Sequence, residues 1–128
     1  MVEHWGHGRL GAYSIVWSNV IAPDGTEYST VYVAADDKII TASCGPESFD
    51  IQPTYANGTA TTGTLSGFAL RAYLGGAKVL SFQVTIAVVV TNAAPVYMRW
   101  TGSIVGSVSG SEVIHGGVAT FEQFNLTA

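Results

Sequence analysis

The sequence predicts an all-β fold, an antiparallel up-and-down β-barrel of about eight strands that forms one domain over residues 1–128. Val, Ile, Thr, Tyr and Ser dominate the chain while helix formers are sparse, a composition typical of strands. Clusters of turn residues recur roughly every 8 to 14 residues, the spacing of antiparallel barrels and sandwiches. No segment shows the apolar period of an amphipathic helix. An open β-sandwich is the alternative architecture.

The expected strands follow one another with short connections. They run over Leu10–Val20, Glu27–Ala35, Lys38–Ser43, Ser48–Thr54, Gly67–Leu74, Lys78–Val90, Val96–Gly106 and Val113–Phe124. Residues 22–25, 35–37 and 74–76 lie between them and contain the Gly, Asp and Pro residues that turns require. Because such links join neighbouring antiparallel strands, the order in the sheet should follow the order in the chain. His4 and His7 precede the first expected strand.

Side-chain alternation predicts how the aromatic residues are distributed. In the first expected strand Tyr13 and Trp17 share one face, and in the second Tyr28 and Tyr32 share one face. We therefore expect the aromatic side chains to gather on one side of the sheet.

The sixth expected strand becomes apolar on both faces at residues 86–90, Ile-Ala-Val-Val-Val. A strand with two apolar faces is normally covered on both. Since one face of a barrel strand looks inward, the outer face of this segment is expected to pack against another chain, a further domain or a terminal segment. The expected partner is a second copy of this chain or a chain that supplies a missing domain.

Charge and composition exclude several classes of partner. Charged residues make up 11% of the chain against about 25% in an ordinary domain, and the formal net charge is −4. The Lys and Arg residues are scattered and form no basic stripe, so no nucleic-acid partner is expected. The longest uncharged stretch, Val79–Tyr97, is interrupted by polar residues and Pro95 and is a poor membrane helix. A start without a basic, then apolar run and a single cysteine, Cys44, favour the cytoplasm.

No motif for metal or nucleophilic catalysis stands out. His4, His7 and His115 could form a three-histidine zinc site, but no cysteine pair or carboxylate completes the set, and surface or capping roles explain them better. Cys44 has no identifiable base to activate its thiol. No serine stands in a G-x-S-x-G elbow. We expect no metal and no cofactor.

The aromatic residues are the strongest candidates for a binding site, since rings with polar tips line pockets for extended apolar small molecules. The candidate substrate-binding residues are Tyr13, Trp17, Tyr32, Tyr97 and Trp100. Three polar strand residues could orient the ligand, namely Asn19, Gln83 and Arg99. The alternative is that these rings simply form the core.

Three segments of the chain resemble a known family. They are Glu3–Trp17, with the sequence EHWGHGRLGAYSIVW, then Tyr32–Ala34, and Gly116–Phe124, with the sequence GGVATFEQF. Together they are similar to the C-terminal lipocalin-like domain of the fungal decalin-forming Diels-Alderases, relatives of the hydroxyneurosporene-synthase or carotenoid-hydratase-like family. Ala12 stands where that pattern has proline, and Ser18-Asn19 stand where it has Phe-Asp. The family's larger N-terminal domain, which forms the pocket together with this one, is absent from the sequence.

The resemblance implies a pericyclase in secondary-metabolite biosynthesis. An intramolecular [4+2] cycloaddition is accelerated, by up to several kcal/mol, when a pocket folds a linear polyene of the polyketide type into its reactive conformer. A hydrogen bond to the dienophile carbonyl helps if it strengthens in the transition state. The implied roles are cavity walls for Tyr13, Trp17, Tyr32 and Trp100, and donation to the carbonyl by Asn19, Gln83 or Arg99. Alanine at Trp17 should then cost turnover more than folding.

Two alternatives belong to other classes. The chain could be a non-catalytic, lipocalin-like binder of an apolar metabolite, in which case ligands quench tryptophan fluorescence and remain unchanged. It could also be a structural subunit of a heteromeric cyclase, in which case the barrel is packed solid and the apolar segment at residues 86–90 is its purpose.

Overall fold

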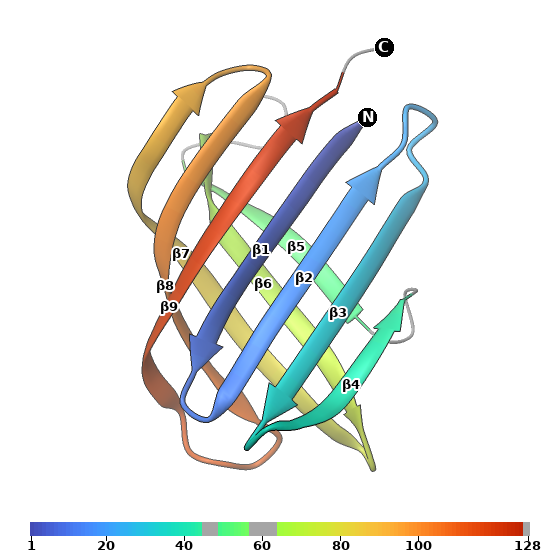
Figure 1. Ribbon diagram of the computed structural model, residues 1–128, viewed down its shortest axis with the longest axis vertical. Coiled ribbons are helices and arrows are strands. Elements are labelled where there is room, and N and C mark those ends of the chain that lie inside the picture. The colour runs from blue at the N-terminus through green and yellow to red at the C-terminus, as the bar shows by residue number, and fades with distance from the viewer. Residues whose placement is uncertain (45–48, 57–63, 127–128) are drawn as a thin grey trace.

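The computed structural model describes residues 1–44, 49–56 and 64–126, and these form an all-β molecule (Figure 1). Within these ranges nine strands are present and no helix. The strands are β1 (Val2–Leu10), β2 (Tyr13–Ile21), β3 (Glu27–Ala35), β4 (Lys38–Cys44), β5 (Phe49–Ala56), β6 (Thr64–Gly75), β7 (Lys78–Ala93), β8 (Tyr97–Val108) and β9 (Ile114–Asn125). No helix in the described ranges is therefore available to cross a membrane.

All nine strands belong to one antiparallel sheet, in the order β4-β3-β2-β1-β9-β8-β7-β6-β5. Consecutive strands pair everywhere except between β4 and β5, where the described residues form no ladder, and β1 pairs with β9 to join the two halves. The sheet curls until β3 contacts β5 and β4 contacts β6. The predicted barrel is confirmed as a strongly curved sheet, but the sheet is not closed. We call the line where β3 and β4 meet β5 and β6 the seam.

The eight expected strands are present with shifted ends, but the first was expected from Leu10, which instead ends β1, and the expected start at Ser48 lies outside the described residues. The expectation that His4 and His7 precede the first strand is wrong. Both belong to β1, which holds two glycines, residues that weaken strands. Gly6 faces the interior opposite Trp17, and a Cβ atom at this position would lie 2.5 Å from Cε2 of the indole. Glycine is therefore required where the indole ring crosses the backbone of β1. Because glycine is a poor strand former, the sequence pattern did not predict this strand.

The turn between β3 and β4 lies where the sequence placed it. Asp36 and Asp37 both have positive φ angles, 51° and 59°. Two successive residues of this kind form the turn that matches the right-handed twist of a tight hairpin, and aspartate tolerates the conformation better than most side chains.

Beyond Thr85, β7 forms an edge of the sheet, because it pairs there with β8 but no longer with β6, while β8 remains paired with β9. The ladder between β6 and β7 reaches only Thr85, whereas the ladder between β7 and β8 continues to Ala93 and Tyr97. The valines at 88–90 are all exposed. The doubly apolar segment therefore lies in an edge strand, and its valines are exposed on both faces of the sheet.

Aromatic rings fill much of the barrel interior. Trp17 meets Phe82 edge-on, with ring centroids 6.1 Å apart, and Phe68 meets Phe121 at 5.7 Å. Trp100 stacks on Phe121 at 5.5 Å. All five side chains are buried, so they supply a large share of the apolar area removed from water on folding.

Candidate functional site

A pocket opens at the seam, where β3 passes β5. It has a volume of about 220 Å³ and is lined by Glu27, Ser29, Phe49, Asp50, Ile51 and Tyr73. β4 pairs with β3 only from Thr30 onward, so the first residues of β3 lie at an edge of the described ladder. Polar groups of Glu27, Ser29 and Asp50 therefore face the same space as the buried apolar residues Phe49 and Ile51.

Asn19 connects this seam pocket with the barrel interior. It follows Ile15 and Trp17 on the inward face of β2 and is only 3% exposed. Its amide nitrogen donates to Ser29 Oγ at 2.9 Å and to Glu27 Oε2 at 3.3 Å. Two residues of the seam pocket are thus direct partners of a polar side chain inside the barrel.

His4 lies beside Asn19, its cross-strand neighbour on β1, and is 5% exposed. Its ring packs edge-on against Phe68, with centroids 5.3 Å apart. Burial lowers the pKa of the imidazole below its usual value, although hydrogen bonds with Asn19 and Gln123 and the charge of Glu27 act in the opposite direction. The ring is therefore neutral at pH 7. We refer to His4, Asn19 and Gln123 as the inner polar cluster, which lies at the end of the barrel that carries both chain termini (Figure 1).

Two buried polar atoms have no hydrogen-bond partner within the described ranges, His4 Nδ1 and Trp17 Nε1. The hydrogen bonds of the His4 ring with Asn19 and Gln123 leave Nδ1 without a partner. A neutral ring that donates through Nε2 leaves Nδ1 as an acceptor, whereas an indole nitrogen is a donor only. Each unpaired buried group costs about 1–3 kcal/mol, so native proteins keep few of them.

A second polar cluster lies on the outer face of β8 and β9. Arg99 donates from Nε to Glu122 Oε1 at 2.7 Å, and its Nη2 donates to the same oxygen. The Glu122 side chain is 9% exposed and that of Arg99 is 45% exposed. The hydrogen bonds and negative charge of Glu122 raise the pKa of the guanidinium above its ordinary value. This outer ion pair satisfies its own charges and leaves no free acid or base.

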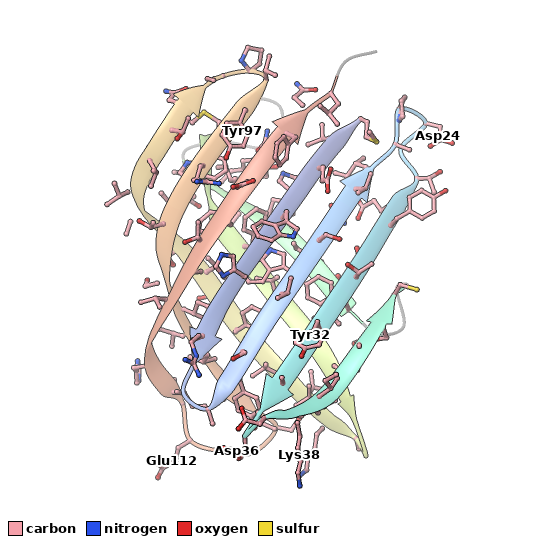
Figure 2. All side chains as sticks on the ribbon, viewed as in Figure 1. Asp24, Tyr32, Asp36, Lys38, Tyr97 and Glu112 are labelled. Atoms are coloured by element: carbon pink, nitrogen blue, oxygen red, sulfur yellow. The ribbon has the colours of Figure 1, made fainter. Side chains whose placement is uncertain are left out.

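The residues predicted to contact a ligand divide between the two faces of the sheet. Trp17, Asn19 and Trp100 are buried inside, and Tyr13 packs against the core. The outer face holds the other four, namely Tyr32, Gln83, Tyr97 and Arg99. Figure 2 shows Tyr97 near the end of the barrel that carries the termini and Tyr32 farther along, on β3. The eight residues therefore do not line one cavity.

The expectation that the aromatic residues gather on one side is wrong for Tyr28 and Tyr32, which both lie on the outer face. The register pairs Trp17 with Val31 and Val16 with Tyr32, so the indole and the phenol point to opposite faces. The sequence alone shows which residues of one strand share a face, but it does not show which face of the next strand they meet.

The alternative of a three-histidine metal site is also wrong. Within the described ranges no group of three or more His, Cys, Asp or Glu side chains is placed to hold a metal ion. His4 points into the barrel and His7, three residues later, lies exposed on the other face.

Sequence reasoning considered His4 only as a metal ligand or a surface residue, and it missed Gln123 and Glu27 as candidates. The available signal was the alternation of His4, Gly6, Gly8 and Leu10, which places one polar side chain on an inward row of small or apolar residues.

Comparison with known proteins identifies two longer relatives, and this chain matches only part of each. No family model matches the chain. Quinolone epoxide rearrangement protein penF of Penicillium thymicola is 34% identical over 122 residues, and quinolone epoxide rearrangement protein asqO of Emericella nidulans is 33% identical over 111 residues. The matches cover 88% and 84% of this chain, but 32% and 29% of the two relatives. The chain thus spans about a third of the length of the curated relatives that it matches.

Solved structures share the fold. A crystal structure of CghA superposes with a TM-score of 0.76 at 13% identity, and kievitone hydratase from Nectria haematococca superposes with a TM-score of 0.65 at 14% identity. Both matches cover 98% of this chain and 40% of the solved chain. The resemblance stated from the three sequence segments is confirmed by these findings.

Proposed function

Since this chain is related to the fungal family that contains the quinolone epoxide rearrangement proteins, we propose that it is the lipocalin-like part of a cofactor-independent cyclase or isomerase of secondary metabolism. The observation that supports this most strongly is the inner polar cluster. A neutral imidazole and an amide lie among aromatic rings, next to a pocket at the seam. Isomerisations of apolar molecules need such an enclosure with one or two polar contacts and no external reactant.

The proposed reaction is an intramolecular [4+2] cyclisation of a linear polyene. The aromatic interior selects the folded conformer of the substrate, which lowers the entropic part of the barrier. Asn19 donates to the dienophile carbonyl by exchanging its long hydrogen bond to Glu27 at 3.3 Å, while Ser29 at 2.9 Å keeps the amide oriented. Of the three donors considered from the sequence, Asn19 is the one inside the barrel.

A second candidate reaction, favoured by the names of the two curated relatives, is the rearrangement of an epoxide. The ring C–O bond breaks, a neighbouring group migrates to the electron-poor carbon, and the product keeps the formula of the substrate. Aromatic faces such as those of Trp17 and Trp100 stabilise positive charge that develops on carbon. Both reactions therefore use the same features of the interior.

The experiment incubates the purified chain with two probes, a linear polyene with a carbonyl-activated alkene and a quinolone with an epoxide in its side chain. Liquid chromatography with mass spectrometry detects a product of unchanged mass and new retention time. We expect Asn19→Leu to lower the rate about tenfold, the worth of one hydrogen bond in the transition state. The matched control Gln52→Leu, on the exposed face of β5, should keep the rate. Binding of both probes without conversion would instead support the non-catalytic binder.

We further propose a partner for the outer face, either a second copy or a chain that supplies the part found in the longer relatives. Tyr32, Val105 and Val118 are exposed there, and the valines at 88–90 are exposed on the edge strand β7. Tyr32, Gln83, Tyr97 and Arg99 can take part in the reaction in such an assembly, because the partner would enclose them. Light scattering of the chain, alone and co-expressed with candidate partners, should give a mass above that of one chain. A monomer under all conditions would refute this partner.

A further inference from the structure

The last part of β7, residues 86–93, is a free edge of the sheet. The last residue of β7 that pairs with β6 is Thr85, which lies opposite Gly67. A Cβ atom at Gly67 would clash with the carbonyl oxygen of Val84, so the two strands cross closely at this point. Beyond it β7 pairs only with β8, and its other side has no partner strand within the described ranges. A free row of backbone N–H and C=O groups is a template for a further strand.

The side chains of this free edge are apolar and uncharged. Every residue from Ala87 to Ala93 is exposed, and the three valines at 88–90 are each about half exposed. No Lys, Arg, Asp or Glu occurs in the sequence between Lys78 and Arg99. Valine favours strands because its branched side chain packs well against cross-strand neighbours. The free edge therefore has the composition of a strand that is paired on both sides.

The edges at the seam differ from the free edge, because they carry the features that prevent the addition of a strand. β5 contains Asp50 and Pro53, and β4 begins at Lys38. Charged side chains and proline on an edge block pairing with a further strand. Contacts of β3 with β5 and of β4 with β6 also bring these edges together. Residues 86–93 contain neither a charge nor a proline.

The free edge does have one feature that restricts its partners, an irregular ladder with β8. The register shifts between Ile86 and Val88 and again between Val89 and Thr91, so β7 contains two extra residues. Bulges of this kind increase the local twist of a strand. A flat strand would fit such an edge poorly. A second copy of the same segment has the same twist, because it contains the same two bulges.

We propose that residues 86–92 of β7 pair antiparallel with the same residues of a second copy of this chain, around a two-fold axis at Val89. In this register Val89 lies opposite itself, and Val88 lies opposite Val90 of the second copy. A charged residue near the axis would meet its own like charge, so self-pairing requires the uncharged sequence that is observed. A different chain could instead match charges of opposite sign. The inference deepens the proposed function, and it rests on the proposal that this chain has a partner.

The experiment measures the mass of the wild type and of two variants by light scattering over a range of concentrations. We expect a dimer for the wild type. Val89→Lys and Val89→Glu should each raise the dissociation constant of the dimer more than about tenfold, because like charges then meet at the axis. An equal mixture of the two variants should restore the dimer, since lysine then faces glutamate. Ser81→Lys, an exposed position in the paired part of β7, is the matched control and should keep the wild-type mass.

Several results would overturn the inference. A wild type that stays monomeric at every concentration would do so, as would a dimer that persists in both Val89 variants. Loss of the dimer in Val118→Lys but not in Val89→Lys would place the interface on the outer face of β9 instead. Urea unfolding checks that the variants fold. If the Val89 variants do not, Val90→Lys and Val88→Glu replace them, because these positions lie opposite each other and their mixture should dimerise more tightly than either alone.

Failure of this inference can be distinguished from failure of the proposed function. A complex with a co-expressed chain that survives Val89→Lys, formed by a chain that is monomeric alone, would refute the second copy and support a different partner. Conversion of the polyene or the epoxide probe tests the reaction separately. A wild-type dimer that responds to the Val89 variants as expected, with neither probe converted, would support the pairing and refute the reaction.

Discussion

The inner polar cluster and the outer ion pair lie in the same part of the sheet and are built in opposite ways. Outside, Arg99 and Glu122 carry opposite charges and satisfy each other. Inside, His4 is neutral, and one of its nitrogens has no partner within the described ranges. The outer pair is what a stable surface needs. The inner cluster keeps an unpaired buried nitrogen, which lowers stability and which an apolar side chain would avoid. In native proteins such a destabilising feature usually marks a functional site.

The largest expected effect is the difference in stability between an alanine substitution on the inner face of the sheet and one on the outer face. Trp17→Ala should lower the free energy of unfolding by about 3–5 kcal/mol, since a buried aromatic side chain is lost and a cavity remains. Trp5→Ala, on the half-buried outer face, should cost clearly less. Urea unfolding of both variants tests this, and equal losses would contradict the placement of the two rings. Because Trp17 is 1% exposed, we now expect alanine there to impair folding as well as turnover.

An intermediate effect concerns the pH dependence of stability. Burial lowers the pKa of His4 in the folded state, so the unfolded chain binds more protons once the pH falls below about 6.5. The contribution of neutral His4 is complete above that pH and is lost as the pH falls toward the folded-state pKa. The charge of Glu27 acts on the ring in the opposite direction to burial, and burial is the larger effect.

Urea unfolding of the wild type and of His4→Gln between pH 7 and pH 5 measures this contribution. The wild type should lose more stability over that interval than the variant, since the variant has no titrating group at position 4. The exposed His7 and His115 are present in both proteins, so their contributions to the pH dependence cancel when the two proteins are compared. Parallel curves would contradict a buried, neutral His4.

The smallest expected effect belongs to the outer ion pair. Arg99 is half exposed, so salt screens its attraction to Glu122. Arg99→Ala should lower the melting temperature slightly in dilute buffer, and the difference from the wild type should shrink as salt is added. A large difference that salt does not change would show that the pair is not solvent-exposed as described.

Much of the fold could be predicted from the sequence because strand composition, alternation and turns are local signals. The turn at Asp36 and Asp37 and the strand Glu27–Ala35 agree with the structure residue by residue. β1 could not be recognised in this way, since Gly6 is set by a ring that arrives from the next strand. The low strand propensity of glycine argues against a strand at this position, but the packing of Trp17 against Gly6 stabilises one.

The candidate site was less predictable because it depends on register. Pairing Trp17 with Val31 sends Tyr32 outward, and a shift of one residue would have sent it inward. Asn19 was a candidate from its residue type, but its contact with His4 joins two strands whose pairing the sequence did not reveal. The missing partners of His4 Nδ1 and Trp17 Nε1 are features of the whole barrel, which no local pattern contains.

The most direct test of the central claim, that ligand binds the inner polar cluster rather than the outer face, is the indole region of a proton–nitrogen NMR spectrum. The chain has three tryptophans, and Trp5→Phe and Trp17→Phe assign their signals. On addition of the quinolone epoxide probe we predict that the Trp17 indole signal shifts, while the Trp5 signal stays in place. A shift of Trp5 with an unchanged Trp17 would contradict the account.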